Sequence, residues 1–143
     1  MTEAAFWDAS ALMPLCVDLK STPDVDRLFQ ETSIVVWWAT TVEIRSALAR
    51  LVRMQRASIG EHGQGCRLLQ ELRQGWVEIL PSDSLRGFAE ELPERFALRA
   101  GDALQLAAAY TWAMQRPAGR SFISGDKRLL EAAEQMGFSV IAV

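Results

Sequence analysis

The sequence predicts an α/β protein in which a mostly parallel central sheet is covered by helices on both faces. Runs of β-branched and aromatic residues alternate with helical patterns along the whole chain, an order typical of parallel sheets. The helical stretch 103–114 contains no charged residue, so it belongs in the middle of a domain. With 143 residues, half of them hydrophobic and 23% charged, residues 1–143 are expected to form a single domain.

Five strands and seven helices are expected in alternation. The strands are short apolar runs, and the second of them is apolar enough to be buried on both faces. They cover 4–7, 34–38, 76–80, 121–124 and 138–143. The helices show helical spacing of apolar residues. They cover 11–17, 23–30, 44–51, 61–74, 88–92, 103–114 and 127–136.

Local signals predict several helix ends in the first half of the chain. Pro14 fits its helix if it lies in the first turn, where a missing N–H costs little. Thr22 followed by Pro23 is a strong helix start. Thr40 and Glu43 have the spacing of a capping box, which is one explanation of Glu43.

The second half shows similar signals. Gly75 and Gly137 are placed to end helices, and Ser82 or Ser84 can cap the short helix after the third strand. The run 116–119, Arg-Pro-Ala-Gly, separates the uncharged helix from the next strand.

Four acidic residues stand at the ends of predicted strands or at the starts of helices. They are Asp8, Glu43, Asp102 and Asp126. Ligands of parallel sheets bind outside the carboxyl ends of the strands, so all four side chains are expected to face one edge. For Asp102 alone, a cap or first-turn position is the simpler explanation, but capping does not explain a cluster.

Four carboxylates gathered without compensation repel one another, so at neutral pH they hold protons or bind a cation. Oxygen ligands with no His or Cys cluster favour Mg²⁺ or Mn²⁺ over Zn²⁺, and such a site suits metal-assisted phosphodiester hydrolysis. Ser10 and Ser124 each lie two residues from an acid. They either support a carboxylate or the scissile phosphate, or are only cap or turn residues. Nucleotide-binding glycine loops and the serine-hydrolase motif are absent.

The net charge of −3 argues against a surface that is basic all over and binds nucleic acid generally, but it allows a local positive patch. Candidate RNA-binding residues are Arg45, Arg53, Arg56, Arg99 and Lys127. Cys16 and Cys66 lie in apolar helical patterns and are interpreted as buried thiols, not as a disulfide or zinc site. No signal peptide and no apolar run of about 20 residues is visible, so the expected compartment is the cytoplasm.

Four short motifs resemble, in order and spacing, the acidic motifs of PIN-domain proteins, and most closely those of VapC-type toxins from bacterial toxin–antitoxin modules. They are Trp7-Asp8-Ala9-Ser10-Ala11-Leu12, Thr41-Val42-Glu43-Ile44, Ala100-Gly101-Asp102-Ala103-Leu104-Gln105-Leu106-Ala107 and Ser124-Gly125-Asp126-Lys127-Arg128-Leu129. The resemblance implies an α/β/α sandwich, Mg²⁺- or Mn²⁺-dependent endoribonuclease activity, frequent homodimers and a small VapB-like antitoxin. By position it makes the four acids the metal-binding and catalytic residues, with Ser10 and Ser124 beside the first and the last.

The chain departs from this family pattern at two places. Gln105 stands where many relatives carry His, and Lys127 and Arg128 stand where some carry a further acid. The pair Trp37-Trp38 is interpreted either as core packing or as a surface for a dimer or antitoxin. Three functions stay open: a toxin endoribonuclease, a binding module whose acidic groove holds a basic partner segment, and a housekeeping RNA or DNA nuclease.

Overall fold

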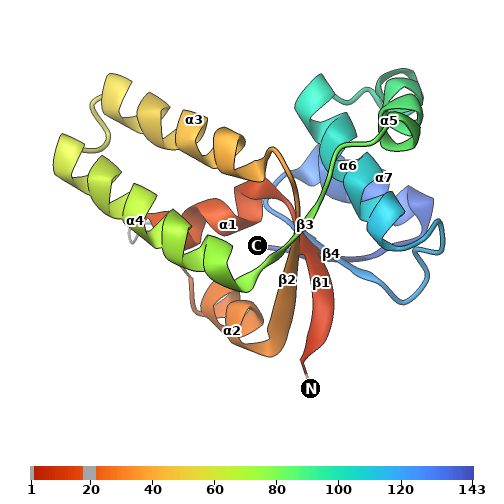
Figure 1. Cartoon of the computed structure of the whole chain (residues 1–143), viewed down its shortest axis with the longest axis horizontal. Coiled ribbons are helices and arrows are strands. Elements are labelled where there is room, and N and C mark those ends of the chain that lie inside the picture. Colours follow the sequence, from red (N-terminus) through yellow and green to blue (C-terminus); the bar gives the residue numbers. More distant parts are fainter. Residues whose placement is uncertain (1, 18–21) are drawn as a thin grey trace.

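The computed structural model describes residues 2–17 and 22–143, in which five strands alternate with seven helices (Figure 1). In chain order the elements are β1 (Glu3–Trp7), α1 (Ala9–Cys16), α2 (Pro23–Glu31), β2 (Thr32–Trp37), α3 (Thr40–Arg53), α4 (Ile59–Gly75), β3 (Val77–Ile79), α5 (Asp83–Phe96), α6 (Ala100–Trp112), β4 (Ser121–Ser124), α7 (Lys127–Met136) and β5 (Ser139–Ala142). Each expected element is present. Ser82 caps α5, which confirms one of the two expected caps, and the helix runs on to Phe96, so it is longer than the short helix that was expected.

The five strands form one parallel sheet in the order β3-β2-β1-β4-β5. β1 lies in the centre, where Ala5 is paired with Ile34 of β2 on one side and with Ser121 of β4 on the other. Because all strands run in the same direction, their carboxyl ends meet at one edge of the sheet. The predicted fold class is therefore confirmed, and the segments that follow β1, β2 and β4 are neighbours.

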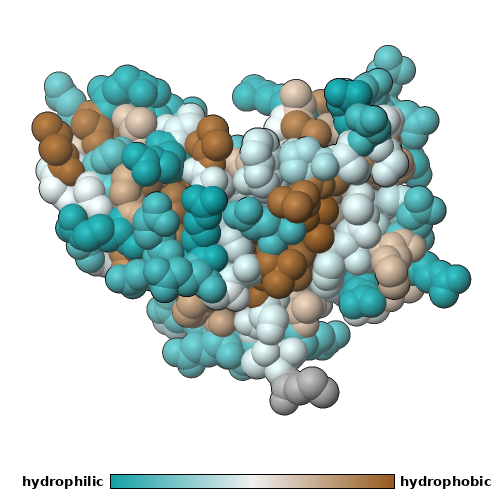
Figure 2. Space-filling view, viewed as in Figure 1, coloured by the Kyte–Doolittle hydropathy of each residue, from teal (hydrophilic) through white to brown (hydrophobic). Residues whose placement is uncertain are grey.

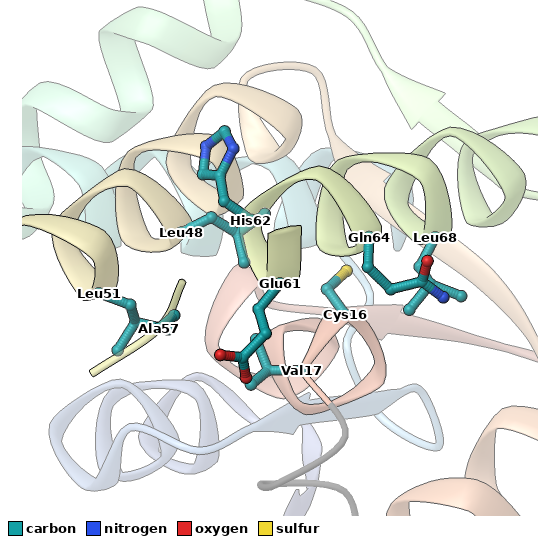
Figure 3. A pocket seen from close by; sticks show the side chains of 9 residues that line it. All are labelled: Cys16, Val17, Leu48, Leu51, Ala57, Glu61, His62, Gln64 and Leu68. Atoms are coloured by element: carbon teal, nitrogen blue, oxygen red, sulfur yellow. The ribbon is translucent and has the colours of Figure 1, made fainter. Parts of the chain in front are cut away.

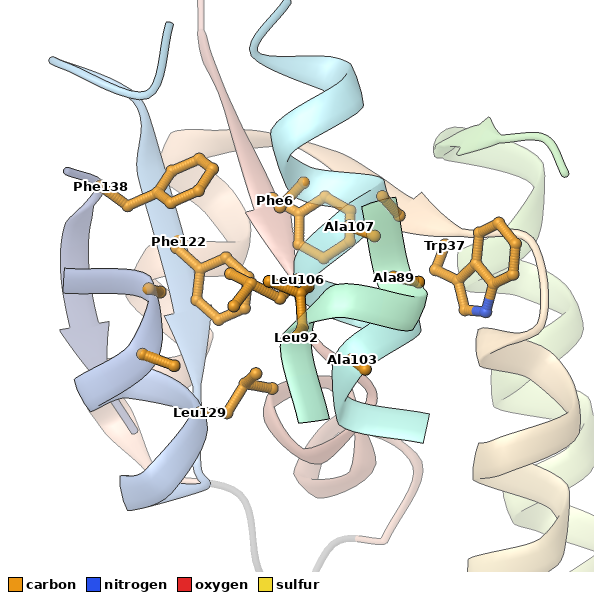
Figure 4. Packing of buried hydrophobic residues seen from close by; sticks show 14 of the residues in the cluster. Phe6, Trp37, Ala89, Leu92, Ala103, Leu106, Ala107, Phe122, Leu129 and Phe138 are labelled. Atoms are coloured by element: carbon orange, nitrogen blue, oxygen red, sulfur yellow. The ribbon is translucent and has the colours of Figure 1, made fainter. Parts of the chain in front are cut away.

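Alternate side chains of each strand pack against separate helical layers. On one face, Phe6 and Phe122 stack with ring centroids 5.5 Å apart and pack with Leu106 of α6 and with residues of α5 and α7 (Figure 4). On the other face, residues such as Trp7 and Ile123 pack with α1 to α4. The uncharged helix α6 is buried along most of its length, as predicted. None of the helices within residues 2–17 and 22–143 combines the length and apolar character that crossing a bilayer requires.

The expected position of Pro14 is wrong. Helix α1 begins at Ala9, immediately after Asp8, so Pro14 is its sixth residue and lies outside the first turn. The strand turns directly into the helix at Asp8, whose carbonyl oxygen accepts from the N–H of Ala11 at 3.0 Å. Since proline has no N–H, the carbonyl of Ser10 lacks its usual helical donor.

The capping box expected at Thr40 and Glu43 is also wrong. Ala39 precedes α3 without any side-chain cap, and both Thr40 and Glu43 lie inside the helix. A capping box forms instead at the start of α4, between Ser58 and Glu61.

The two adjacent tryptophans have different surroundings. Trp37 is 5% exposed and belongs to the cluster against α5 to α7, which confirms core packing for this residue. Trp38 is 51% exposed and meets Trp37 edge to face. Val77 and Leu80, on and beside β3, are exposed as well. Figure 2 shows apolar surface in the region of β3, which is an edge strand of the sheet.

Candidate functional site

The four acids predicted from strand ends lie on elements that meet at the carboxyl edge of the sheet. Asp8 follows β1, and Asp126 follows β4 and precedes α7. Glu43 and Asp102 lie in the first turns of α3 and α6. Burial is the main cause of the raised pKa values of Asp8, Glu43 and Asp102, and the charges of the neighbouring carboxylates raise them further. Asp8 and Asp102 therefore lie within electrostatic range of each other and of both Glu43 and Asp126.

Asp8 is the most buried of the four, with 4% of its surface exposed, and it is held by two hydroxyl groups. Ser10 and Ser124 both donate to Asp8 Oδ2, the second at 2.8 Å. Their hydroxyl oxygens in turn accept from the N–H groups of Gly125 and Asp126, each at 2.9 Å. Burial raises the pKa of Asp8, and the two hydroxyl bonds oppose that rise. Both serines thus support a carboxylate instead of capping a helix.

A hydrogen bond from Gln105 of α6 holds the Glu43 carboxylate. Its Oε2 accepts from Nε2 of Gln105 at 3.0 Å, and the same Nε2 donates to Oγ1 of Thr40 at 3.1 Å. The pKa of Glu43 is raised from 4.5 to about 7, chiefly by burial; the hydrogen bond from Gln105 opposes the rise, and the charges of Asp8 and Asp102 add to it. The carboxyl group of Glu43 is therefore close to its titration point at neutral pH.

Asp102 lies in the first turn of α6, and Asp126 lies at the start of α7. The pKa of Asp102 is raised from 3.8 to about 6, chiefly by burial and also by the charges of Asp126 and Asp8, while Arg99 opposes the rise. Asp126 caps α7, because its Oδ1 accepts from the backbone N–H of Arg128 at 2.9 Å and of Leu129 at 3.2 Å. The cap fixes the orientation of this carboxylate.

The donor chemistry of the cluster suits a hard divalent cation. Within the described part of the chain the ion pairs join other residues, so no Lys or Arg neutralises the four acids at salt-bridge distance. In the same residues, no group of three or more His, Cys, Asp or Glu side chains is close enough to hold a metal ion. The cluster thus supplies oxygen ligands that no salt bridge in the described residues neutralises, and it does not form a closed cage. Mg²⁺ commonly uses one or two carboxylates and keeps several waters, which fits such a site.

A positively charged pocket adjoins the acids. Three cationic side chains line it together with Asp102 and Asp126: Arg99, Lys127 and Arg128. The first two of these were predicted from the sequence, whereas the third was noted there only as a departure from a family pattern. All three are exposed, so the pocket presents cations to solvent directly beside carboxylates.

The other predicted cations are spread along α3. Arg45 is exposed two residues beyond Glu43. Arg53 ends the helix, about 15 Å further along its axis than Glu43, and Arg56 follows it. The structure therefore separates Arg53 and Arg56 from the acidic cluster.

A second pocket lies between α1, α3 and α4, at the opposite end of α1 from Asp8 (Figure 3). Its lining is mostly apolar and includes Cys16 and His62. Burial raises the pKa of the Cys16 thiol to about 12, which is typical of an unreactive structural cysteine. Cys66 lies 3.9 Å from the ring nitrogens of His62. Both cysteines are free, as predicted, but only Cys16 is buried; Cys66 is partly exposed, so the expectation of a buried thiol is wrong for it.

Sequence reasoning missed the contacts of Gln105 and Thr40, both of which are 0% exposed. A signal for the first was present, because Gln105 is a polar residue in the otherwise apolar stretch 103–109 of a helix expected to be buried. A buried amide requires hydrogen-bond partners, and a carboxylate at the same sheet edge is such a partner.

No protein-family model matches the sequence, and no curated protein sequence matches it significantly. Solved structures do resemble it. The structure of PAE2754 from Pyrobaculum aerophilum has a TM-score of 0.65 and 19% identity, over 98% of this chain and 90% of that one. A toxin–antitoxin complex from Klebsiella pneumoniae has a TM-score of 0.58 and 14% identity, over 86% and 87%. FitAB bound to the IR36 DNA fragment has a TM-score of 0.62 and 13% identity, over 96% and 94%. At these identities the similarity establishes a shared fold, and the chain has a PIN-like three-layer α/β/α sandwich.

Proposed function

We propose that the protein is a Mg²⁺- or Mn²⁺-dependent endoribonuclease and the toxin of a VapC-type toxin–antitoxin module. The proposal depends on one observation: four carboxylates converge at the carboxyl edge of a PIN-like sheet, and no cation pairs with them in the described part of the chain. One of the similar structures is a toxin–antitoxin complex, which supports the toxin part of the proposal.

The proposed reaction is hydrolysis of an RNA phosphodiester. Asp8, Glu43, Asp102 and Asp126 would provide the ligands, of which one or two carboxylates at a time would contact the cation while waters fill its other positions. When bound, the cation supplies activation of water and neutralisation of charge at the phosphoryl group. Ser10 and Ser124 keep one oxygen of Asp8 in place.

The positively charged pocket contributes substrate binding in this proposal. Arg99, Lys127 and Arg128 line it beside two of the acids. Cationic side chains of this kind bind backbone phosphates and position a nucleic acid without reading its sequence. They would place a phosphate next to the carboxylates, which on their own repel a polyanion.

A second candidate function is a non-catalytic binding module. In the described residues, no three of the acidic side chains stand close enough to hold a metal ion. The acidic cluster therefore also suits a guanidinium or ammonium group from a basic partner segment. This function predicts partner binding that is unchanged in EDTA and no cleavage of any RNA.

The experiment that separates the two is cleavage of a mixed pool of structured RNAs by the purified protein in Mg²⁺, Mn²⁺ or EDTA. Asp102→Asn is run beside it, because it removes a charge at nearly constant size, and its fold is checked by circular dichroism and thermal unfolding. We expect metal-dependent cleavage that is lost in D102N. Cleavage in EDTA, or an unaltered rate in the variant, would refute the carboxylate site.

We further propose a cytoplasmic homodimer that a small VapB-like antitoxin inhibits. Expression of the wild type is expected to arrest growth, expression of D102N is not, and light scattering of the purified protein gives the mass of the oligomer. A housekeeping nuclease would cleave RNA or DNA in the same cleavage assay without arresting growth, which distinguishes it from a toxin.

A further inference from the structure

Gln105 links the two helices that bring Glu43 and Asp102 to the acidic edge. It is the sixth residue of α6, one turn beyond Asp102, and its side chain is completely buried. Its Nε2 donates to Glu43 Oε2 at 3.0 Å and to Thr40 Oγ1 at 3.1 Å. Both acceptors belong to the first turn of α3, so a single amide nitrogen uses both of its hydrogens to hold that turn.

Packing alone does not explain an amide at this position. Gln105 Oε1 is buried and has no hydrogen-bond partner within the described residues, and an unpaired buried carbonyl oxygen is unfavourable. A methionine would fill a similar volume without that unpaired oxygen. The reverse orientation of the amide would turn its oxygen toward the Glu43 carboxylate, which is repulsive. The feature that an amide adds is the pair of N–H bonds to α3.

Glu43 is the acid that most needs such a bond. The charges of Asp8 and Asp102 act against its own charge, and no salt bridge in the described part of the chain holds it. Glutamate is also longer than aspartate, so it loses more rotational freedom when its carboxylate is fixed. Among the residues that the structure describes, Gln105 supplies the side-chain hydrogen bond that holds Glu43 beside these repelling neighbours.

We propose that Gln105 is a positioning residue, which holds the Glu43 carboxylate beside Asp8 and Asp102 so that a divalent cation meets an already ordered ligand. The inference rests on the proposed function of the four acids and extends it to a fully buried residue outside that set.

The test is a calorimetric titration of Mn²⁺ into the whole protein, without RNA, for the wild type and Gln105→Met. Methionine keeps the length and volume of the side chain but cannot donate a hydrogen bond. Partners that hydrogen-bond to metal ligands typically contribute about 10- to 100-fold in affinity, so the Kd for Mn²⁺ is expected to rise at least about 10-fold. Gln105→His restores one N–H donor and is expected to recover most of that loss.

Two further variants separate positioning from general loosening of the helix. Ala108→Gly, in the same helix and fully buried in the apolar cluster, is expected to lower the thermal stability without changing the Kd for Mn²⁺. In a Glu43→Gln background, Q105M is expected to change the Kd by less than about two-fold, because its effect passes through the Glu43 carboxylate. Gln105→Leu replaces Q105M if that variant does not fold.

The outcomes are distinct. Binding of Mn²⁺ by folded Q105M as tightly as by the wild type would overturn this inference alone. An equal loss of affinity from Q105M with and without Glu43 would show that Gln105 acts by another route, and it would overturn the inference too. Failure of the wild type to bind Mn²⁺ would overturn the proposed function, and the positioning role would fall with it.

Discussion

Neutralising Glu43 is expected to stabilise the cation-free protein. Glu43→Gln keeps the size of the side chain and an oxygen that can accept from Gln105, and it removes a charge that burial and the neighbouring carboxylates Asp8 and Asp102 disfavour. The variant tests whether the acidic edge is maintained at the expense of stability, as is common for functional sites.

The magnitude follows from the pKa of Glu43. Folding raises this pKa from 4.5 to about 7, and one pKa unit corresponds to about 1.4 kcal/mol, so the charged form costs at most about 3.4 kcal/mol. Glu43 is partly exposed, and screening by solvent reduces that cost to about 1–2 kcal/mol. Between pH 4.5 and 7 the folded state holds the proton more tightly than the unfolded chain. Stability therefore falls as pH rises through this window, and the full cost is present above pH 7.

Urea unfolding in EDTA at pH 4.5, 6, 7 and 8 measures the effect. At pH 8, E43Q is expected to exceed the wild type by about 1–2 kcal/mol in the free energy of unfolding, or about 3–8 °C in Tm. At pH 4.5 the two proteins should differ little, because the wild-type side chain is then largely protonated. Lower stability of E43Q at pH 8, or wild-type stability that increases from pH 5 to 8, would refute the reasoning.

Three further predictions concern single contacts. Ser124→Ala removes a donor to Asp8 and the acceptor of the Asp126 N–H, so urea unfolding should show a loss of about 1–3 kcal/mol; an unchanged midpoint would contradict the network. Gly65→Ala places a Cβ 3.0 Å from Leu48 Cδ2 and 3.1 Å from the Cys16 carbonyl oxygen and should cost about 1–3 kcal/mol. Gly63→Ala in the same helix, with no contact closer than 3.7 Å, should stabilise by up to about 1 kcal/mol; equal effects of the two substitutions would rule out the close helix contact as the cause. Arg99→Gln should weaken the salt dependence of RNA binding: the slope of the logarithm of the binding constant against the logarithm of the salt concentration should fall in magnitude by about one. Filter binding in EDTA measures this slope, and an unchanged value would exclude a contact between Arg99 and a phosphate.

Much of the fold could be predicted because its signals are local. Apolar runs bounded by turn residues mark the strands, and parallel strands place their carboxyl ends at one edge whatever their order. Asp8 and Asp126 could therefore be assigned to the same edge without knowledge of the strand order. The order itself depends on which strand pairs with which, and no short motif in the sequence contains that information.

The errors occurred where a local motif competes with a distant partner. Thr40 and Glu43 have capping-box spacing, but both side chains bond to Gln105, which lies more than 60 residues away in the chain. Pro14 was expected in a first turn, because the sequence does not reveal that the helix starts directly at the end of β1. The first error reflects a tertiary contact that overrides local preference, and the second reflects a helix start that no local signal marks.

The central position of β1 also determines when during synthesis the acidic edge can form. β1 is translated early, but one of its two neighbours is β4, and Asp8 receives a hydroxyl bond from Ser124, 116 residues later in the chain. Such distant pairing must wait until the late segment has left the ribosome. A nascent chain that stops before β4 thus contains Asp8, Glu43 and Asp102 without the strand that completes their edge. If the protein cuts RNA as proposed, the ribosome that makes it is exposed to an active site only after β4 has been translated.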